Sequence, residues 1–105
     1  MASEIRLSYT VGLVLLAIDR EYRFGFDIMD ATGLPSGTVY PALRRLENAG
    51  AIQARWEGTK QAFQENRPAR RYYRLTGLGR ELLGEARARY VLPQLAEERL
   101  NEVES

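Results

Sequence analysis

The sequence contains no cysteine and no histidine among its 105 residues. Without cysteine no disulfide bond can form, and nothing in the composition points to an oxidising compartment. Zinc sites are built mainly from these two residue types, and so are the usual nucleophile–base pairs of enzymes. A glycine-rich phosphate loop is missing as well. The composition therefore argues against an enzyme and against a metalloprotein, and we expect no cofactor.

Long apolar runs are also absent. The longest extends from Val11 to Ile18, eight residues that include Gly12, whereas a membrane-spanning helix needs about 20. The N-terminus lacks the series of a basic stretch, an apolar core and a small-residue cleavage site that marks a signal peptide. We therefore expect a cytoplasmic protein without a membrane partner.

The net charge is only +1, but the charges are unevenly distributed along the chain. Residues 1–36 carry a net charge of −2, residues 37–80 carry +6 and residues 81–105 carry −3. A basic block between acidic flanks indicates a polyanionic partner. The alternative is a solvated basic face without a partner, which charge alone does not exclude.

Apolar spacing predicts three helices in the first half of the chain. The first carries a core-facing stripe formed by Leu7, Val11, Val14, Leu15 and Ile18. The second extends from about residue 24 to residue 32, with Gly33 at its C-terminal end. The third begins at Ser36, a good N-cap residue, and ends near Ala49 and Gly50.

A proline lies inside the third helix, at position 41. Such a proline loses one backbone hydrogen bond and presses against the carbonyl four residues earlier, which here belongs to Gly37. At about 100° per residue, the inward side of this helix holds Val39, Leu43 and Leu46. The outward side holds Gly37, Thr38, Pro41, Arg44, Arg45 and Asn48, with Tyr40 on the flank. We therefore expect Pro41 on the exposed face, where its ring can pack on a sugar or a thymine methyl group.

Two segments of alternating polarity follow and predict a β-hairpin. In "AIQARW" the apolar side holds Ile52, Ala54 and Trp56, and we expect Trp56 in the core of the hairpin. In "RRYYRLT" one face holds Tyr73 and Leu75, and the other holds Tyr72 and Arg74. The connecting residues 57–69 form a loop far longer than the about two to five residues that are common in hairpins. A loop of this length is usually functional or mobile.

A last helix is predicted after Thr76, which is placed to cap it. Pro93 predicts a break or kink near residues 89–93. An apolar stripe passes through and beyond this break, and its members include Leu82, Ala86, Tyr90, Leu92, Leu95 and Leu100. A second copy of the chain is the simplest cover for this stripe, and we expect these residues in a dimer interface. Folding back on the first helix of the same chain is the alternative.

The order helix, helix, turn, helix, hairpin, helix predicts a winged helix-turn-helix, a mainly α fold with a small two-stranded β-hairpin. We interpret residues 1–76 as the DNA-binding domain and residues 77–105 as a C-terminal dimerisation helix. The second helix of such a unit enters the major groove, and its candidate DNA-binding residues are Ser36, Thr38, Tyr40, Pro41, Arg44 and Arg45. The hairpin would be the wing, with phosphate contacts from Lys60, Arg67, Arg70, Arg71 and Arg74.

Two alternatives stay open at this point. Tyr40 and Tyr72 are equally well explained as aromatic residues at the edge of the core. The whole fold can also serve as a winged-helix module for protein–protein interaction, with the same apolar framework and no DNA readout. The cations on the outward side of the third helix favour double-stranded DNA as the partner.

Four stretches resemble the PadR family of bacterial transcriptional regulators: "LSYTVGLVLLAI", "FGFDIMDATG", "SGTVYPALRRLENAGAI" and "RRYYRLTGLGRELL". The resemblance covers roughly residues 7–90 and implies a homodimer joined through the C-terminal helix. Such a dimer binds a pseudo-palindromic operator, usually as a repressor. By position, the resemblance places Tyr40 and Arg44 in the reading helix, and it places in the wing Arg70, Arg71 and Tyr72. Some relatives bind flat aromatic ligands between their subunits, so a small-molecule effector of unknown identity is a further expectation.

Overall fold

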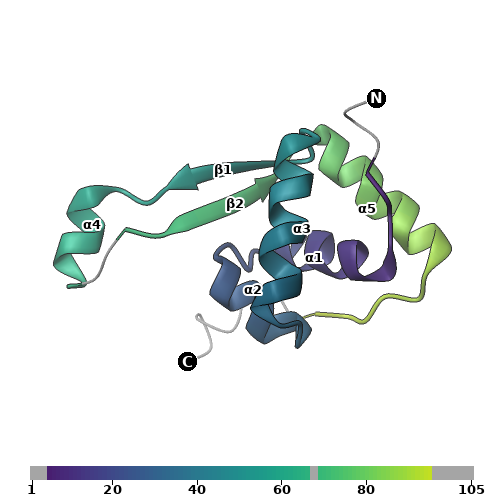
Figure 1. Ribbon diagram of the computed structural model, residues 1–105, viewed down its shortest axis with the longest axis horizontal. Coiled ribbons are helices and arrows are strands. Elements are labelled where there is room, and N and C mark those ends of the chain that lie inside the picture. The colour runs from purple at the N-terminus through teal and green to yellow at the C-terminus, as the bar shows by residue number, and fades with distance from the viewer. Residues whose placement is uncertain (1–4, 67–68, 96–105) are drawn as a thin grey trace.

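The computed structural model describes residues 5–66 and 69–95. In chain order these residues form α1 (Tyr9–Asp19), α2 (Gly25–Thr32), α3 (Ser36–Asn48), β1 (Ile52–Trp56), α4 (Thr59–Gln64), β2 (Arg71–Leu75) and α5 (Gly77–Arg89). Figure 1 shows the hairpin of β1 and β2 projecting from a body of helices. The predicted class, a mainly α fold with one two-stranded antiparallel hairpin, is confirmed.

Helix α1 is buried on every side. Ser8 caps its N-terminus, since the Ser8 hydroxyl oxygen accepts a hydrogen bond from the Val11 N–H at 3.1 Å. All eight residues from 11 to 18 are buried, whereas a surface helix buries a single stripe. Helices α2, α3 and α5 and strand β2 all contact α1. The apolar run in the sequence is therefore the centre of the core, and no described helix is long and apolar enough to cross a membrane.

A tight turn connects α2 to α3. Helix α2 ends at Gly33, whose φ of 75° lies in the left-handed region that favours glycine. The Thr32 hydroxyl donates to the Ile28 carbonyl oxygen at 2.7 Å and accepts from the Leu34 N–H at 3.2 Å. These bonds satisfy backbone groups that the end of a helix would otherwise leave unpaired.

The N-terminus of α3 differs from the prediction by one residue. The N-cap is Pro35, and Ser36 is the first helical residue, with no side-chain capping bond. The Pro35 carbonyl oxygen accepts the N–H groups of Thr38 at 2.9 Å and Val39 at 3.0 Å. Since Pro35 is already extended, with φ of −75° and ψ of 162°, the helix starts directly after it.

Strands β1 and β2 pair with Ile52 opposite Leu75 at the base and Trp56 opposite Arg71 near the tip. The segment before α2 lies along the other edge of β2, because the Tyr73 N–H donates to the Arg23 carbonyl oxygen at 2.9 Å. A neighbouring bridge joins residues 24 and 72. This short extended segment covers the edge of β2 that β1 leaves open.

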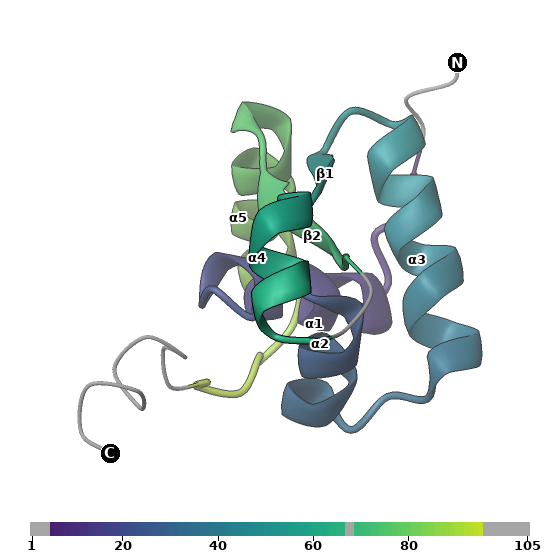
Figure 2. The same cartoon turned by 90° about the vertical axis from the view of Figure 1, so that its left-hand side faces the viewer.

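The outer half of the hairpin lies beyond the helical body (Figure 1). Trp56 is 67% exposed, so its predicted place in the hairpin core is wrong. The alternation of the strand identifies the correct face, because Arg71, which pairs with Trp56, reaches Glu47 of α3. The helices nevertheless leave most of Trp56 exposed. The long loop contains α4, a short helix that the sequence did not predict. Figure 2 shows α4 at the near end of the hairpin, with α3 on one side and α5 on the other.

Helix α5 folds back on α1 of the same chain. A methyl group added to Gly12 of α1 would lie 3.1 Å from the Cβ of Ala86. The Tyr90 hydroxyl donates to the Leu7 carbonyl oxygen at 3.0 Å, and the Tyr90 ring packs edge-on against Tyr9. The helix ends at Arg89, and the chain is extended at residue 90. The predicted break before Pro93 is therefore confirmed.

This packing changes the interpretation of the apolar stripe. Ala86 has no exposed surface, because it faces α1. The expectation that Ala86 contacts a partner subunit is therefore wrong. Four further stripe residues are half-buried against the core of their own chain, namely Leu82, Tyr90, Leu92 and Leu95. Leu100 lies outside the described residues. For this part of the stripe, the alternative of intramolecular packing is what the structure shows.

We predict opposite effects for two glycine substitutions in α5. In Gly79→Ala the new methyl group would overlap with the Ala51 carbonyl oxygen, a backbone atom that cannot move aside. The expected loss of stability is about 1–3 kcal/mol. At Gly84 nothing lies within 4 Å of the new methyl group, so Gly84→Ala should stabilise the helix by about 0.5–1 kcal/mol. Urea denaturation of both variants measures these changes, and equal effects at the two positions would contradict this packing.

Candidate nucleic-acid interface

The outward side of α3 presents the candidate reading residues. The inward side is buried and consists of Val39, Ala42, Leu43 and Leu46. The exposed residues are Ser36, Gly37, Tyr40, Arg44, Arg45 and Asn48. Thr38 and Pro41 are half-buried, so Pro41 is partly exposed on the side of α3 where we expected it. A methyl group added to Gly37 would meet no atom within 4 Å. The first turn of α3 is therefore accessible to a ligand.

Two arginines of α3 have no ion-pair or hydrogen-bond partner for their side chains among the described residues. Neither Arg44 nor Arg45 makes an ion pair or a side-chain hydrogen bond with any residue in the described part of the chain. Both are exposed. A guanidinium group carries five N–H donors in a planar fork and suits guanine edges and phosphates. Arg44 and Arg45 are therefore the cations of α3 that can bind an anion from outside the chain.

Tyr40 has one face against α2 and the other toward solvent. A methyl group added to Gly25, the first residue of α2, would lie 2.5 Å from a ring carbon of Tyr40. The tyrosine is nevertheless 42% exposed. It therefore joins α2 to α3 and at the same time contributes to the outward surface, so the two alternatives set out for it are not exclusive.

Arg71 connects the wing to α3. Its guanidinium Nη2 lies 2.7 Å from the Glu47 Oε2, and its guanidinium carbon lies 5.9 Å from the centre of the Trp56 ring. Both partners of the ion pair are partly exposed, so the pair contributes about 1 kcal/mol or less to stability. The ion pair joins β2 to the C-terminal end of α3, two elements whose paired residues are 24 positions apart in the chain.

Arg70 is held in a similar way on the other side of the hairpin. Its guanidinium carbon lies 3.9 Å from the centre of the Phe24 ring, a cation–π contact. Its backbone N–H donates to the Glu57 Oε1 at 3.1 Å, and its Nε lies 3.9 Å from the same oxygen. Tyr72 packs edge-on against Phe24 and is half-buried. These wing residues thus hold the hairpin together and against the segment before α2.

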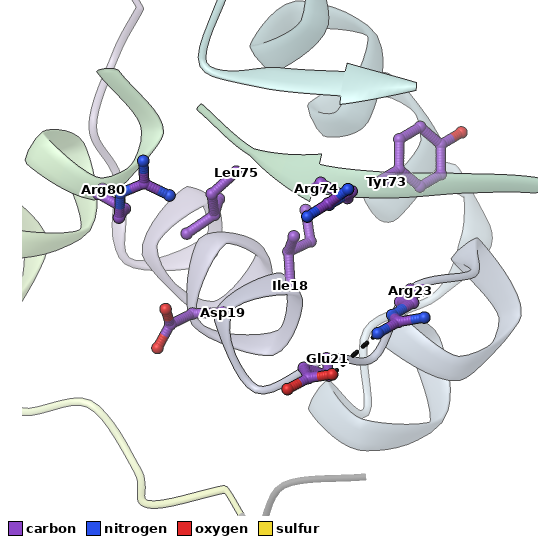
Figure 3. Close-up of a pocket in the computed structure, with 8 residues that line it drawn as sticks. All are labelled: Ile18, Asp19, Glu21, Arg23, Tyr73, Arg74, Leu75 and Arg80. Atoms are coloured by element: carbon purple, nitrogen blue, oxygen red, sulfur yellow. Dashed lines mark hydrogen bonds and ion pairs between the residues drawn. The ribbon is translucent and has the colours of Figure 1, made fainter. Parts of the chain in front are cut away.

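The hairpin cations without an ion pair among the described residues include one that the sequence analysis named, Lys60, and one that it did not, Arg55. Arg55 and Lys60 are exposed and make no ion pair with the described residues. Arg55 was missed, although its outward position in the alternating strand was a usable signal. Arg74 is also exposed, but it lies at the base of the hairpin in a hollow of about 420 Å³ that includes Asp19 and Glu21 (Figure 3). Arg67 lies outside the described residues.

The pairing register shows how the hairpin side chains divide between its two faces. Arg55 lies opposite Tyr72, and Trp56 lies opposite Arg71. Side chains of directly paired residues point to the same face, and successive residues alternate. Arg55 and Arg74 therefore lie on one face, whereas Arg71 lies on the other. Two of the predicted wing cations, Arg71 and Arg74, therefore lie on opposite faces of the hairpin.

Tyr73 of β2 is buried, and its side chain lies between the hairpin and the helices. Burial raises the pKa of its hydroxyl above 10.0, and the nearby Arg71 partly opposes this rise. The hydroxyl therefore stays neutral near pH 7. Its position supports packing rather than acid–base chemistry.

The family model of the PadR-like transcriptional regulators matches residues 14–85. The matched range includes α2, α3, the whole hairpin and most of α5. No curated protein and no solved structure gives a significant match to the chain. The resemblance noted in the sequence is thereby confirmed.

We predict that Gly25 and Tyr40 are energetically coupled. Gly25→Ala should destabilise the protein by about 1–3 kcal/mol, because the methyl group and the Tyr40 ring would overlap. In a Tyr40→Ala background the same substitution should change stability by less than about 0.5 kcal/mol. A double-mutant cycle from thermal or urea denaturation gives the coupling. The same penalty in both backgrounds would show that the ring does not rest on Gly25.

Proposed function

The chain belongs to the PadR-like family of transcriptional regulators, and from this premise we propose that it binds double-stranded DNA in a sequence-specific manner through α3 and the hairpin. The observation that carries this proposal is the pair of exposed arginines on the outward side of α3, Arg44 and Arg45, which form no ion pair within the described ranges 5–66 and 69–95. Arginine is also common in protein–protein interfaces, but two arginines on the outward surface of one helix, inside a block of net charge +6, favour a polyanion. DNA offers both the phosphates and the guanine edges that guanidinium groups bind.

In the proposed complex, α3 lies in the major groove. The groove is about 12 Å wide and admits one α-helix. Arg44 is on the most outward line of α3, so we assign it to a base edge, where a bidentate contact with guanine is the commonest specific contact. Tyr40 and the exposed part of Pro41 lie beside it. Arg55 and Lys60 of the hairpin contact the backbone, while Arg70 and Arg71 keep the wing in place.

The proposal extends to a homodimer that represses transcription from a pseudo-palindromic operator. Two symmetric copies of α3 would read two half-sites, and a repressor acts by occupying a promoter. Support for the dimer comes from the C-terminal segment, where Val91 is 95% exposed and Leu78 is 36% exposed. These apolar side chains continue the half-buried stripe of Leu82, Leu92 and Leu95 outward. A small-molecule effector would act on the same dimer, as in relatives that the sequence resembles.

DNA binding is tested by selecting bound sequences from a random duplex library and titrating the selected duplex with salt. The logarithm of affinity falls by about 0.9 per phosphate contact for each unit in the logarithm of salt concentration. With free cations present in two subunits, we expect a slope steeper than about −4. Arg44→Ala should weaken the selected duplex about 5- to 150-fold, as expected for loss of one specific base contact of roughly 1–3 kcal/mol.

The matched control is Arg89→Ala, which removes an exposed arginine from the last turn of α5 and should leave binding unchanged. A scrambled duplex provides the second comparison. If Arg44→Ala weakens selected and scrambled duplexes by the same factor, Arg44 contacts phosphate rather than a base. Failure of the unmodified protein to bind any duplex in a salt-dependent way would favour the protein–protein module instead.

The dimer is tested by light scattering over a range of protein concentrations. We expect the mass of a dimer for the unmodified chain and a shift toward the monomer for Val91→Glu, because a charge would enter the apolar contact. Phe63→Glu is the control, since Phe63 is 84% exposed on α4, at the end of the hairpin. Thermal stability should rise with concentration for the dimer only. A monomeric mass at all concentrations would rule out the dimer.

A further inference from the structure

A surface hollow of about 520 Å³ lies between the segment before α1 and the C-terminal half of α3. Its polar side chains come from both segments: Arg6 and Ser8 from the first, Arg45 and Asn48 from the second. Arg6, Arg45 and Asn48 are exposed, and Ser8 is half-buried at the cap of α1. Hydrogen-bond donors therefore line this hollow. The resemblance to the family assigned no DNA-binding role to these residues.

The electrostatics of this hollow favour an anion. Among the described residues, no aspartate or glutamate lines it, and neither Arg6 nor Arg45 makes an ion pair with any of them. Two guanidinium groups beside one hollow repel each other, and an anion between them removes this repulsion. The hollow near Arg74 differs, because Asp19 and Glu21 line it.

Helix geometry places this hollow away from the wing. Residues 45 and 47 are separated by about 200° around the helix axis. Glu47 faces the wing, since it forms the ion pair with Arg71, so Arg45 faces the opposite flank. Figure 1 shows the same arrangement, with the hairpin leaving α3 on the left and the segment before α1 on its right.

These observations identify a ligand when combined with the dimensions of DNA. An α-helix with its side chains is about 10–12 Å across, and the major groove is about 12 Å wide. A helix seated there has one phosphate backbone on each flank. We propose that Arg6 and Arg45 bind a backbone phosphate on the flank of α3 that the wing does not reach, so that each subunit holds both strands. This inference rests on the proposed DNA binding and adds a second backbone contact to it.

The proposal is tested by fluorescence anisotropy of the full chain with the selected duplex and a scrambled duplex at several salt concentrations. Arg6→Gln and Arg45→Gln should each reduce the salt slope by about 0.9 per subunit. Both should weaken the two duplexes by similar factors, because phosphate contacts carry no sequence information. Arg6→Lys should restore most of the slope, since a point charge suffices for phosphate. Arg89→Gln, the control, should match the unmodified protein.

The outcomes separate this proposal from the proposed function. Salt-dependent binding by the unmodified protein establishes DNA binding, whatever the variants do. If it binds with a steep slope and Arg6→Gln has the same slope, the second phosphate contact is wrong. If Arg6→Gln weakens the selected duplex much more than the scrambled one, Arg6 reads bases and the backbone assignment is wrong. Circular dichroism and thermal denaturation confirm that each variant is folded, and a loss that Arg6→Lys does not restore would indicate a structural role.

Discussion

The burial of α1 on all sides is the constraint on which the rest of the structure depends. Every residue from 11 to 18 must be covered, and a chain of 105 residues has few elements to do so. Helices α2, α3 and α5 and strand β2 share the task. Each of them then has one side committed to α1 and one side left for solvent. The outward side of α3 is thus fixed by packing before any ligand is considered.

Ion pairs divide the arginines of this fold into two groups with different tasks. Arg70 and Arg71 hold the wing through Phe24, Glu57 and Glu47, whereas Arg44 and Arg45 form no ion pair with the part of the chain that the structure describes. The partners are distant along the chain, since Glu47 and Arg71 are 24 residues apart. The same residue type in the same basic block therefore holds the hairpin in one place and stays exposed on α3 in another.

Periodicity predicted the helices and both strands well, because burial of one face is a local property of the sequence. It failed where the extent of the neighbouring elements decides the result. The alternation around Trp56 identified a face of the hairpin but not that the hairpin extends past the helices. The apolar stripe containing Ala86 was correct, but its cover is α1 of the same chain. Helix α4 is too short to show a stripe, and the grouping of Arg6 with Arg45 requires the fold itself.

The cations left free on α3 and beside it are all arginines, and the single lysine of the chain is Lys60. A guanidinium group stays protonated at any pH that a cell experiences, and the chain has no histidine to gain or lose a proton near neutrality. The positive charge offered to a polyanion is therefore constant across physiological acidity. Ionic strength, rather than proton concentration, is the solution variable that would set occupancy. Enzymes that acetylate lysine would find Lys60 as their one side-chain target.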